Sequence, residues 1–262
     1  IKKVFFSTQD LDLRSKNKSK FILKNKNISV SSRLLKKEGK DFYESYFLQH
    51  SKNLPLIDAK IAISKDYYTI NRKKRWITNI HSRKRSHVIR STYNCLISTS
   101  KSINNDNSIL NCRIEGLEKK CPDLVVIDRN LKLKKKLKLL ENIKFRKILL
   151  VTCKNDKKKL SFFKKKGIIV ILINQLNSIE DFKKLFFRLK KKYSRILVET
   201  GLEFINFLIK NKMIKNIYIF QSSYKLKNLG SNYASTKFIK KIKLKNQISV
   251  NLFGDKIFKE KV

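Results

Sequence analysis

The chain has 262 residues, of which 41% are hydrophobic, and its 63 Lys and Arg against 20 Asp and Glu give a formal net charge of +43. The apolar content is too high for a disordered polyelectrolyte, and the length suffices for one large domain or two modest ones, each with its own core. No run of about 18 apolar residues occurs, so the sequence predicts no transmembrane helix.

The first part of the chain is predicted to hold two short strands and a helix. Residues 4–6 and 28–30 have the apolar character of strands, whereas residues 11–26 between them are polar. Residues 34–50 have helical apolar spacing, and Pro55 then interrupts the pattern. Pro55 is therefore the best candidate for a domain boundary.

Beyond Pro55, predicted strands alternate with predicted helices. The strands cover residues 56–63, 95–98, 124–127, 148–151, 168–173, 195–199 and 217–220. The helices cover residues 80–91, a Lys-rich segment after residue 151, residues 178–192, and the segment from Gly201 to Lys210. Strand-like runs near 239–244 and 248–253 close the chain. This order predicts an α/β protein with a mostly parallel sheet and an antiparallel edge.

The positive charge permits two interpretations. Clustered Lys and Arg bind phosphate backbones, which favours a nucleic-acid-binding module. However, 51 of the basic residues are Lys and only 12 are Arg, and Ala occurs three times, a skew that runs through the whole chain as biased coding DNA would produce. Lys runs at 134–136 and 190–192 fall on segments that resemble solvated helix faces. We favour a solvated surface, which would still attract small anionic substrates.

The cysteines and the first residues bear on the compartment. Cys95, Cys112, Cys121 and Cys153 are far apart, without a C-x-x-C or a paired His. This pattern predicts neither a zinc site nor a disulfide framework, but the reduced thiols of a cytoplasmic protein. The chain begins Ile-Lys-Lys without Met or the apolar segment of a signal peptide. We therefore expect a fragment or a trimmed chain, with no export signal.

One stretch, residues 195–207, suggests an anion site. A buried strand is predicted to end at Glu199, and a helix follows Gly201 at once. Such a junction points backbone N–H groups and the positive end of the helix at a bound phosphate. Glu199 also lies where ligands of open α/β sheets gather. An ordinary strand–helix turn has the same local pattern, so the single Gly does not decide between the two.

A second stretch, residues 60–113, contains the only Trp, Trp76, and two arginines, Arg90 and Arg113. Locally, the commoner role for Trp76 is in the core, the alternative being a flat wall beside a bound ring. Because this composition supplies Lys by default, an Arg indicates a need for its planar fork, as in bidentate phosphate binding. A surface position is the alternative for both arginines.

Taken in order, these motifs resemble the reductase domain of the bacterial riboflavin biosynthesis deaminase-reductases. The family pattern runs K-x-A-x-S-x-D-G, S-x-W-I-T, L-R, G-T-x-x-x-D-D-P-x-L-T-x-R, V-x-D and V-E-G-G. Residues 60–66, 74–78, 89–90, 102–113, 126–128 and 198–201 correspond to it in that order. The resemblance covers residues 55 to 262, and residues 1 to about 50 resemble the last strands and helix of the preceding deaminase domain.

The resemblance implies a dihydrofolate-reductase-like fold, NADPH as cofactor, and hydride transfer to C1′ of the ring-opened ribosylamine of 5-amino-6-(5-phosphoribosylamino)uracil. It places at the cofactor Ala62, Trp76, Ser102, Asp106, Arg129, Gly201, Leu202, Glu203, Phe204, Ile205, Asn206 and Phe207. It places at the substrate Lys74, Arg90, Leu110, Arg113 and Glu199. Such chemistry asks the protein for positioning and phosphate recognition rather than for a nucleophile, and we assign no catalytic residue.

Several positions depart from the family pattern. Tyr67 replaces the Gly of the D-G pair, Lys74 stands for a substrate-binding Ser, and Arg129 stands for a cofactor-contacting Ser. Asn107 and Ser108 replace the D-P that follows Asp106, and Glu203 would place a negative charge near a pyrophosphate. We expect these changes to affect rate and affinity more than fold.

The zinc chemistry of the deaminase requires H-A-E and P-C-x-x-C motifs, and neither occurs in these 262 residues. The chain as given is therefore expected not to deaminate, and zinc is expected only in a complete deaminase domain. We predict a deaminase remnant at residues 1–52 and a cytoplasmic, homodimeric NADPH-dependent reductase domain at 53–262, with no metal site and no nucleic-acid or membrane partner. The alternatives are another reductase of the same fold and a basic nucleic-acid-binding module.

Overall fold

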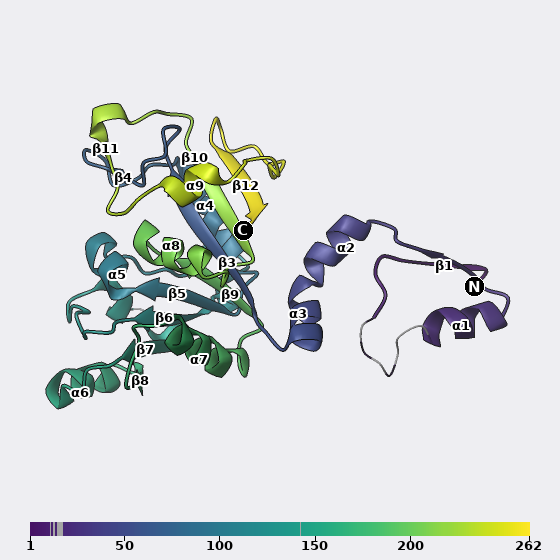
Figure 1. Ribbon diagram of the computed structural model, residues 1–262, viewed down its shortest axis with the longest axis horizontal. Helices are drawn as coiled ribbons and strands as arrows, with labels where there is room; N and C mark the ends of the chain where they lie inside the picture. Colours follow the sequence, from purple (N-terminus) through teal and green to yellow (C-terminus); the bar gives the residue numbers. More distant parts are fainter. Residues whose placement is uncertain (11, 13, 15–17, 142) are drawn as a thin grey trace. The chain divides into compact units, whose positions relative to one another are not determined.

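The computed structural model describes residues 1–10, 12, 14, 18–141 and 143–262 (Figure 1). It divides into two compact units. One comprises Ile1–Leu56 with Leu189–Ser194, and the other comprises Ile57–Arg188 with Arg195–Val262. The first division falls next to Pro55. That the first unit is the end of a deaminase domain stays a prediction.

The first unit pairs two short strands in parallel. Strand β1 (Lys3–Phe6) lies beside β2 (Ser29–Ser32), and helix α1 (Lys18–Asn25) connects them. Helices α2 (Lys36–Phe42) and α3 (Glu44–Lys52) follow. Both predicted strands are confirmed, and the predicted helix over 34–50 is two helices that meet at Tyr43. Helix α1 was not expected, because its segment lacks an apolar face and none of its residues is buried.

The second unit is built on a sheet of eight strands in the order β12-β10-β3-β9-β5-β6-β7-β8. Strands β9, β5, β6, β7 and β8 pair in parallel, as do β3 and β10, whereas β12 is antiparallel to β10. Their bounds are β3 Leu56–Ile63, β5 Cys95–Thr99, β6 Asp123–Ile127, β7 Ile148–Thr152, β8 Ile169–Leu172, β9 Arg195–Glu199, β10 Asn216–Gln221 and β12 Lys256–Lys261. A separate pair, β4 (Ile70–Asn71) with β11 (Gly230–Ser231), is antiparallel.

Helices flank this sheet (Figure 1). They are α4 Ile80–Arg90, α5 Ser100–Asp106, α6 Lys157–Lys165, α7 Ile179–Lys190, α8 Leu202–Lys210 and α9 Lys237–Lys241, with short 3₁₀ turns at Glu118–Lys120, Lys138–Glu141, Ile143–Phe145 and Lys227–Leu229. Asn79, Thr99 and Asp156 cap the first turns of α4, α5 and α6 through their side-chain oxygens. The predicted α/β class with a mostly parallel sheet is confirmed. Among the described residues, no helix combines the length and the apolar character that crossing a bilayer requires.

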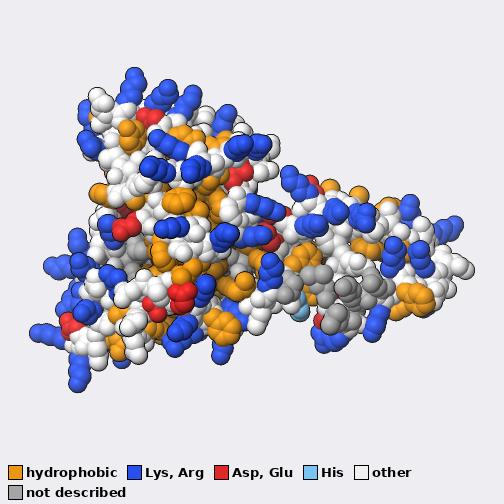
Figure 2. Space-filling model, in the orientation of Figure 1, with side chains coloured by type: hydrophobic (Ala, Val, Ile, Leu, Met, Phe, Trp, Pro, Cys, Tyr) orange, Lys and Arg blue, Asp and Glu red, His pale blue; other side chains and the backbone are white. Residues whose placement is uncertain are grey.

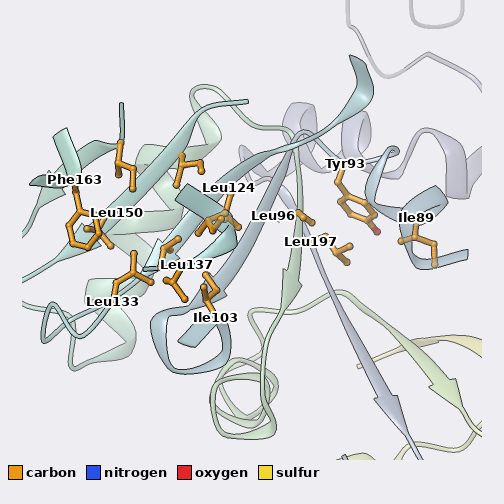
Figure 3. Close-up of a cluster of buried hydrophobic side chains, with 14 of the residues drawn as sticks. Ile89, Tyr93, Leu96, Ile103, Leu124, Leu133, Leu137, Leu150, Phe163 and Leu197 are labelled. Atoms are coloured by element: carbon orange, nitrogen blue, oxygen red, sulfur yellow. The ribbon is translucent and has the colours of Figure 1, made fainter. Parts of the chain in front are cut away.

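The core forms where apolar strands meet apolar helix faces (Figure 3). Leu96, Leu124 and Leu150 of three neighbouring strands are completely buried, and Phe163 of α6 packs into the same cluster. Strands covered in this way show continuous apolar runs rather than alternation, which is why the sequence located them to within one or two residues. The buried sheet provides a rigid base for the polar residues at its edge.

Two of the predicted strands are wrong. Residues 239–244 begin inside helix α9, and residues 248–253 form a loop in which Leu252 makes only an isolated bridge to Asp255. The antiparallel edge exists, but β12 supplies it. In a run of alternating Lys and apolar residues this short, the helical and the extended spacing cannot be told apart. The Lys residues 134–136 are exposed, as expected, but lie in irregular chain rather than on a helix.

Candidate active site

The residues expected at the cofactor gather at the carboxyl ends of the parallel strands. Ala62 is near the end of β3, Ser102 follows β5, Arg129 follows β6, and Gly201 follows β9. Strands that run in one direction bring these ends to one edge of the sheet, where open α/β folds bind their ligands. The topology therefore brings together positions that are up to 139 residues apart in the sequence.

Three hydroxyl groups meet at the ends of β5 and β9. The Oγ1 atoms of Thr99 and Thr200 are 3.0 Å apart, and the Oγ of Ser102 lies 3.1 Å from Thr99 Oγ1 and 2.9 Å from Thr200 Oγ1. The backbone N–H of Gly201 donates to Ser102 Oγ at 3.1 Å. This network fixes the start of α8 against the start of α5.

Helix α8 begins at Gly201 without a side-chain cap. Its first-turn N–H groups and the positive end of its dipole therefore favour an anion at this position. Glu203 puts a carboxylate in the same turn, but the Nζ of Lys101 donates to its Oε2 at 3.0 Å. Both side chains are exposed, so this pair offsets the charge of Glu203 only in part.

The other side chains of α8 mostly face the protein. Leu202 and Ile205 are buried, Phe204 and Phe207 pack on Phe182 of α7, and Asn206 donates through its side-chain Nδ2 to the carbonyl of Ser235 at 2.7 Å. A ligand at this helix would therefore meet backbone groups and Glu203 rather than the apolar side chains.

Trp76 is not a core residue, because 49% of its surface is exposed. The expectation of burial is wrong. The guanidinium groups of Arg75 and Arg83 both lie over its indole ring, with their central carbon atoms 4.8 and 5.0 Å from the ring centroid. Arg75 also donates to the carbonyl oxygen of Asp106 at 2.5 Å, which ties this segment to the end of α5. Trp76 thus presents a flat ring at the surface.

The remaining candidates for cofactor contact lie at the edge of this region. Ala62 is partly exposed on β3. The Nη1 of Arg129 donates to the side-chain oxygen of Asn177 at 2.6 Å, so its guanidinium already has a partner. Asn107, which stands where the family has Asp, has a left-handed backbone (φ 45°) and accepts a hydrogen bond from the N–H of Lys138 through Oδ1. It therefore stabilises the loop after α5.

Glu199 is the centre of a buried ion cluster. Only 7% of its side chain is exposed. The Nε of Arg90 donates to its Oε2 at 2.6 Å and the Nη2 to its Oε1 at 3.1 Å, and the Nζ of Lys60 lies 3.3 Å from Oε1. Arg90 thus uses its bidentate face on Glu199. Sequence reasoning named Glu199 and Arg90 but assigned no role to Lys60, although Lys60 stands in the same motif as Ala62.

The charges in this cluster fix its protonation. Burial alone would raise the pKa of Glu199, but Arg90 and Lys60 outweigh that effect and lower the pKa to about 2. Burial lowers the pKa of Lys60, and the attraction of Glu199 partly offsets this change. Glu199 is therefore an anion at neutral pH, held between two cationic side chains.

His87, which sequence reasoning missed, lies between Arg90 and Arg113. Its Nδ1 is 2.9 Å from the carbonyl oxygen of Asn111, 3.3 Å from the backbone N of Arg113 and 3.3 Å from the Nη1 of Arg90. Its Nε2 faces the Nη2 of Arg113 at 3.5 Å. The two arginines therefore converge on one imidazole. The available signal was spacing, because His87 precedes Arg90 by three residues on one helix and so shares its face.

Arg113 is exposed beside His87, whereas Arg90 is largely covered. Leu110 lies earlier in the same loop, with a left-handed backbone (φ 55°). Lys74 is exposed in the connection between β4 and α4. A cavity of about 400 Å³ opens next to this loop and is lined by Asn111, Cys112, Arg113, Ile114, Glu115, Glu118, Cys121, Phe145 and Arg146.

His87 gives the protein a testable pH dependence. Burial, and then the charge of Arg90, lowers the pKa of His87 from 6.5 to about 4. Between these two pH values the ring is neutral in the folded protein but protonated in the unfolded chain. Stability is therefore fully present above pH 6.5 and declines as the pH falls towards 4. We expect the free energy of unfolding to drop by about 2 to 3 kcal/mol across this window on account of His87.

Denaturant unfolding at a series of pH values measures this effect. His87→Gln should flatten the dependence between pH 6.5 and 4, while His81→Gln, on the same helix, should retain it. An equal slope in wild type and His87→Gln would contradict the assignment of a neutral, buried His87.

The sequence has relatives in a characterised protein family. Residues 55–246 match the model of the RibD C-terminal domain. The riboflavin biosynthesis protein RibD of Aquifex aeolicus is 25% identical over 222 residues, which are 84% of this chain and 61% of that protein. The RibD of Actinobacillus pleuropneumoniae is 24% identical over 204 residues, 77% of this chain and 54% of that protein. The chain thus spans less than two thirds of the length of these curated relatives.

A solved structure shares the fold over the whole length. The diaminohydroxyphosphoribosylaminopyrimidine deaminase/5-amino-6-(5-phosphoribosylamino)uracil reductase of Thermotoga maritima superposes with a TM-score of 0.75 at 19% identity, covering 100% of this chain and 71% of that one. The riboflavin biosynthesis reductase Rib7 of Saccharomyces cerevisiae superposes with a TM-score of 0.62 at 18% identity, covering 85% and 98%.

Proposed function

Since the chain belongs to the RibD C-terminal domain family, we propose that it is an NADPH-dependent reductase of riboflavin biosynthesis, acting on 5-amino-6-(5-phosphoribosylamino)uracil. One observation carries this proposal beyond family membership. The start of α8, which suits an anion, and the Glu199 cluster are separated along the chain only by Thr200. A dinucleotide at the first and a sugar phosphate at the second would therefore lie side by side.

The residues at the sheet edge suit a reduced dinucleotide. The first turn of α8 lacks a side-chain cap, Lys101 offsets the charge of Glu203, and Trp76 offers a half-exposed ring. The backbone N–H groups of Leu202, Glu203 and Phe204 would hold the pyrophosphate, since that of Gly201 already donates to Ser102. Bound NADPH would supply the hydride that reduces C1′ of the ribosylamine to the ribityl product. The preference for NADPH over NADH is part of this proposal, with Arg129 near the 2′-phosphate.

The second cluster suits the substrate. Arg113 is exposed and keeps its guanidinium for the phosphate of the sugar, whereas Arg90 holds Glu199 in place. Glu199, ionised and fixed, would accept hydrogen bonds from ribose hydroxyls. Leu110 would line the same loop, and Lys74 would approach as a point charge. A direct substrate contact by Arg90 stays a prediction.

Three further elements belong to the proposal. The chain would act as a homodimer, residues 1–52 would be the end of a deaminase domain, and zinc would be bound only by a complete deaminase domain. Figure 2 shows Lys and Arg side chains scattered over the visible face among apolar and acidic ones, which favours a solvated surface over a nucleic-acid-binding stripe on that face.

Turnover tests the proposed function directly. Purified protein with NADPH and 5-amino-6-(5-phosphoribosylamino)uracil should oxidise the cofactor and release the ribityl product. Absorbance spectroscopy follows the oxidation of NADPH, and mass spectrometry identifies the product. Absence of NADPH binding, together with sequence-independent and strongly salt-dependent binding of random duplex DNA, would support the nucleic-acid alternative instead.

The pair of Lys101 and Glu203 makes a specific prediction for the cofactor. Lys101→Met leaves the carboxylate of Glu203 uncompensated at the pyrophosphate position, so we expect NADPH to bind roughly two- to fivefold more weakly. Glu203→Gln should strengthen binding by a similar factor. Calorimetric titration measures both. The exposed pair of Glu180 and Lys183 on α7 is the matched control, and Lys183→Met should leave NADPH affinity unchanged. Equal effects of the two Lys variants would contradict a site at α8.

A further inference from the structure

Arg146 lies behind the loop that carries Leu110 and Arg113, at the wall of the adjoining cavity. Its Nη1 donates to the carbonyl oxygens of Leu110 at 2.6 Å and Pro122 at 3.3 Å, and its Nη2 donates to the carbonyl oxygen of Ile109. One guanidinium thus joins the loop to the residue just before β6. In the described part of the chain, no carboxylate lies within ion-pair distance of Arg146.

The loop needs such an anchor. Residues 107–114 form no helix or strand, and Leu110 has a left-handed backbone (φ 55°), which is unfavourable for a residue with a Cβ atom. Strained positions of this kind persist only where surrounding contacts fix them. His87 holds the loop at Asn111 by contacting its carbonyl oxygen. Arg146 holds the loop at Leu110, the strained residue itself.

We propose that Arg146 is a positioning residue for substrate binding, which orients the 109–113 loop so that Arg113 meets the sugar phosphate. This inference rests on the proposed function. A rigid guanidinium suits the task, because its planar fork reaches several carbonyl oxygens at fixed angles, whereas the single ammonium of a Lys does not. Because Arg146 contacts neither Gly201 nor Trp76 in the described structure, its removal should act on the substrate and not on NADPH.

The first test separates binding of the two ligands. Arg146→Met keeps the apolar stem and removes the donors. We expect KM for the pyrimidine substrate to rise at least tenfold, with kcat reduced less than about threefold and the NADPH Kd unchanged. Arg188→Met removes the same charge from an exposed position on α7 and should change none of these values. An unchanged KM, or equal losses in KM and NADPH affinity, would overturn the proposal.

The second test does not depend on turnover. Amide hydrogen exchange at residues 109–113 should accelerate at least tenfold in Arg146→Met, while the amides of β5, β6 and β7 keep their wild-type rates. If Arg146→Met does not fold, Arg146→Lys carries both tests, with KM still raised and the loop still faster. If wild type lacks turnover, the proposed function fails, and unchanged exchange in the loop would then separately overturn the role of Arg146.

Discussion

Glu199→Leu is expected to lower the free energy of unfolding by about 3 to 5 kcal/mol, because it leaves Arg90 and Lys60 buried without their carboxylate. The bidentate contact of Arg90 and the contact of Lys60 both end on this one side chain. The free-energy penalty of burying two cations without a counter-ion is larger than the stabilisation gained from the buried apolar side chain of Leu. Urea unfolding at neutral pH measures the change.

The same experiment has a matched control and a pH signature. Glu180→Leu removes a carboxylate that is 63% exposed in its pair with Lys183, so its effect should stay below about 1 kcal/mol. The pKa of Glu199, lowered from 4.5 to about 2, contributes stability that is present above pH 4.5 and is lost as the pH falls through 2. Comparable losses in the two variants would contradict a buried, charged Glu199.

Arg113→Ala is expected to raise KM for the pyrimidine substrate by roughly tenfold to a hundredfold and to leave the Kd of NADPH within about twofold of wild type. A charge-assisted contact to phosphate is worth about 1.5 to 3 kcal/mol, which corresponds to that range. Steady-state kinetics with varied substrate and calorimetry with NADPH measure the two quantities. Equal losses in both would remove Arg113 from the substrate site.

Two control variants show whether the effect of Arg113→Ala comes from the position of this arginine or only from the loss of one positive charge. Arg188→Ala removes an exposed Arg from α7 and should alter neither constant. Arg90→Ala should behave differently from Arg113→Ala, because it breaks the contact with Glu199 and should lower stability as well as substrate affinity. The structure thus separates two arginines that the sequence treated as equivalent.

Local sequence signals located most of the fold because the elements are apolar over several residues. The run that became β3 was predicted with its bounds, and β9 with the turn at Gly201 likewise. Signals failed where apolar residues were few and evenly mixed with Lys, as at residues 239–244 and in β12. For β12, the partner strand β10 decides the conformation, and no local pattern reports a partner.

The residues of the candidate site divide in the same way. Sequence by itself determined that the chain is an α/β protein, and its ordered motifs pointed to a reductase with Trp76 and Gly201 at the cofactor and with Arg90, Arg113 and Glu199 at the substrate. Only the tertiary structure decided that the guanidinium of Arg90 forms a bidentate contact with Glu199 and that His87 is neutral between two arginines. It also decided that Arg146 donates hydrogen bonds to the loop that carries Arg113. The reason is physical. Most of the strands and helices form on apolar patterns that are local in the sequence, whereas the pKa of a side chain and the availability of its donors depend on groups brought near from distant parts of the chain.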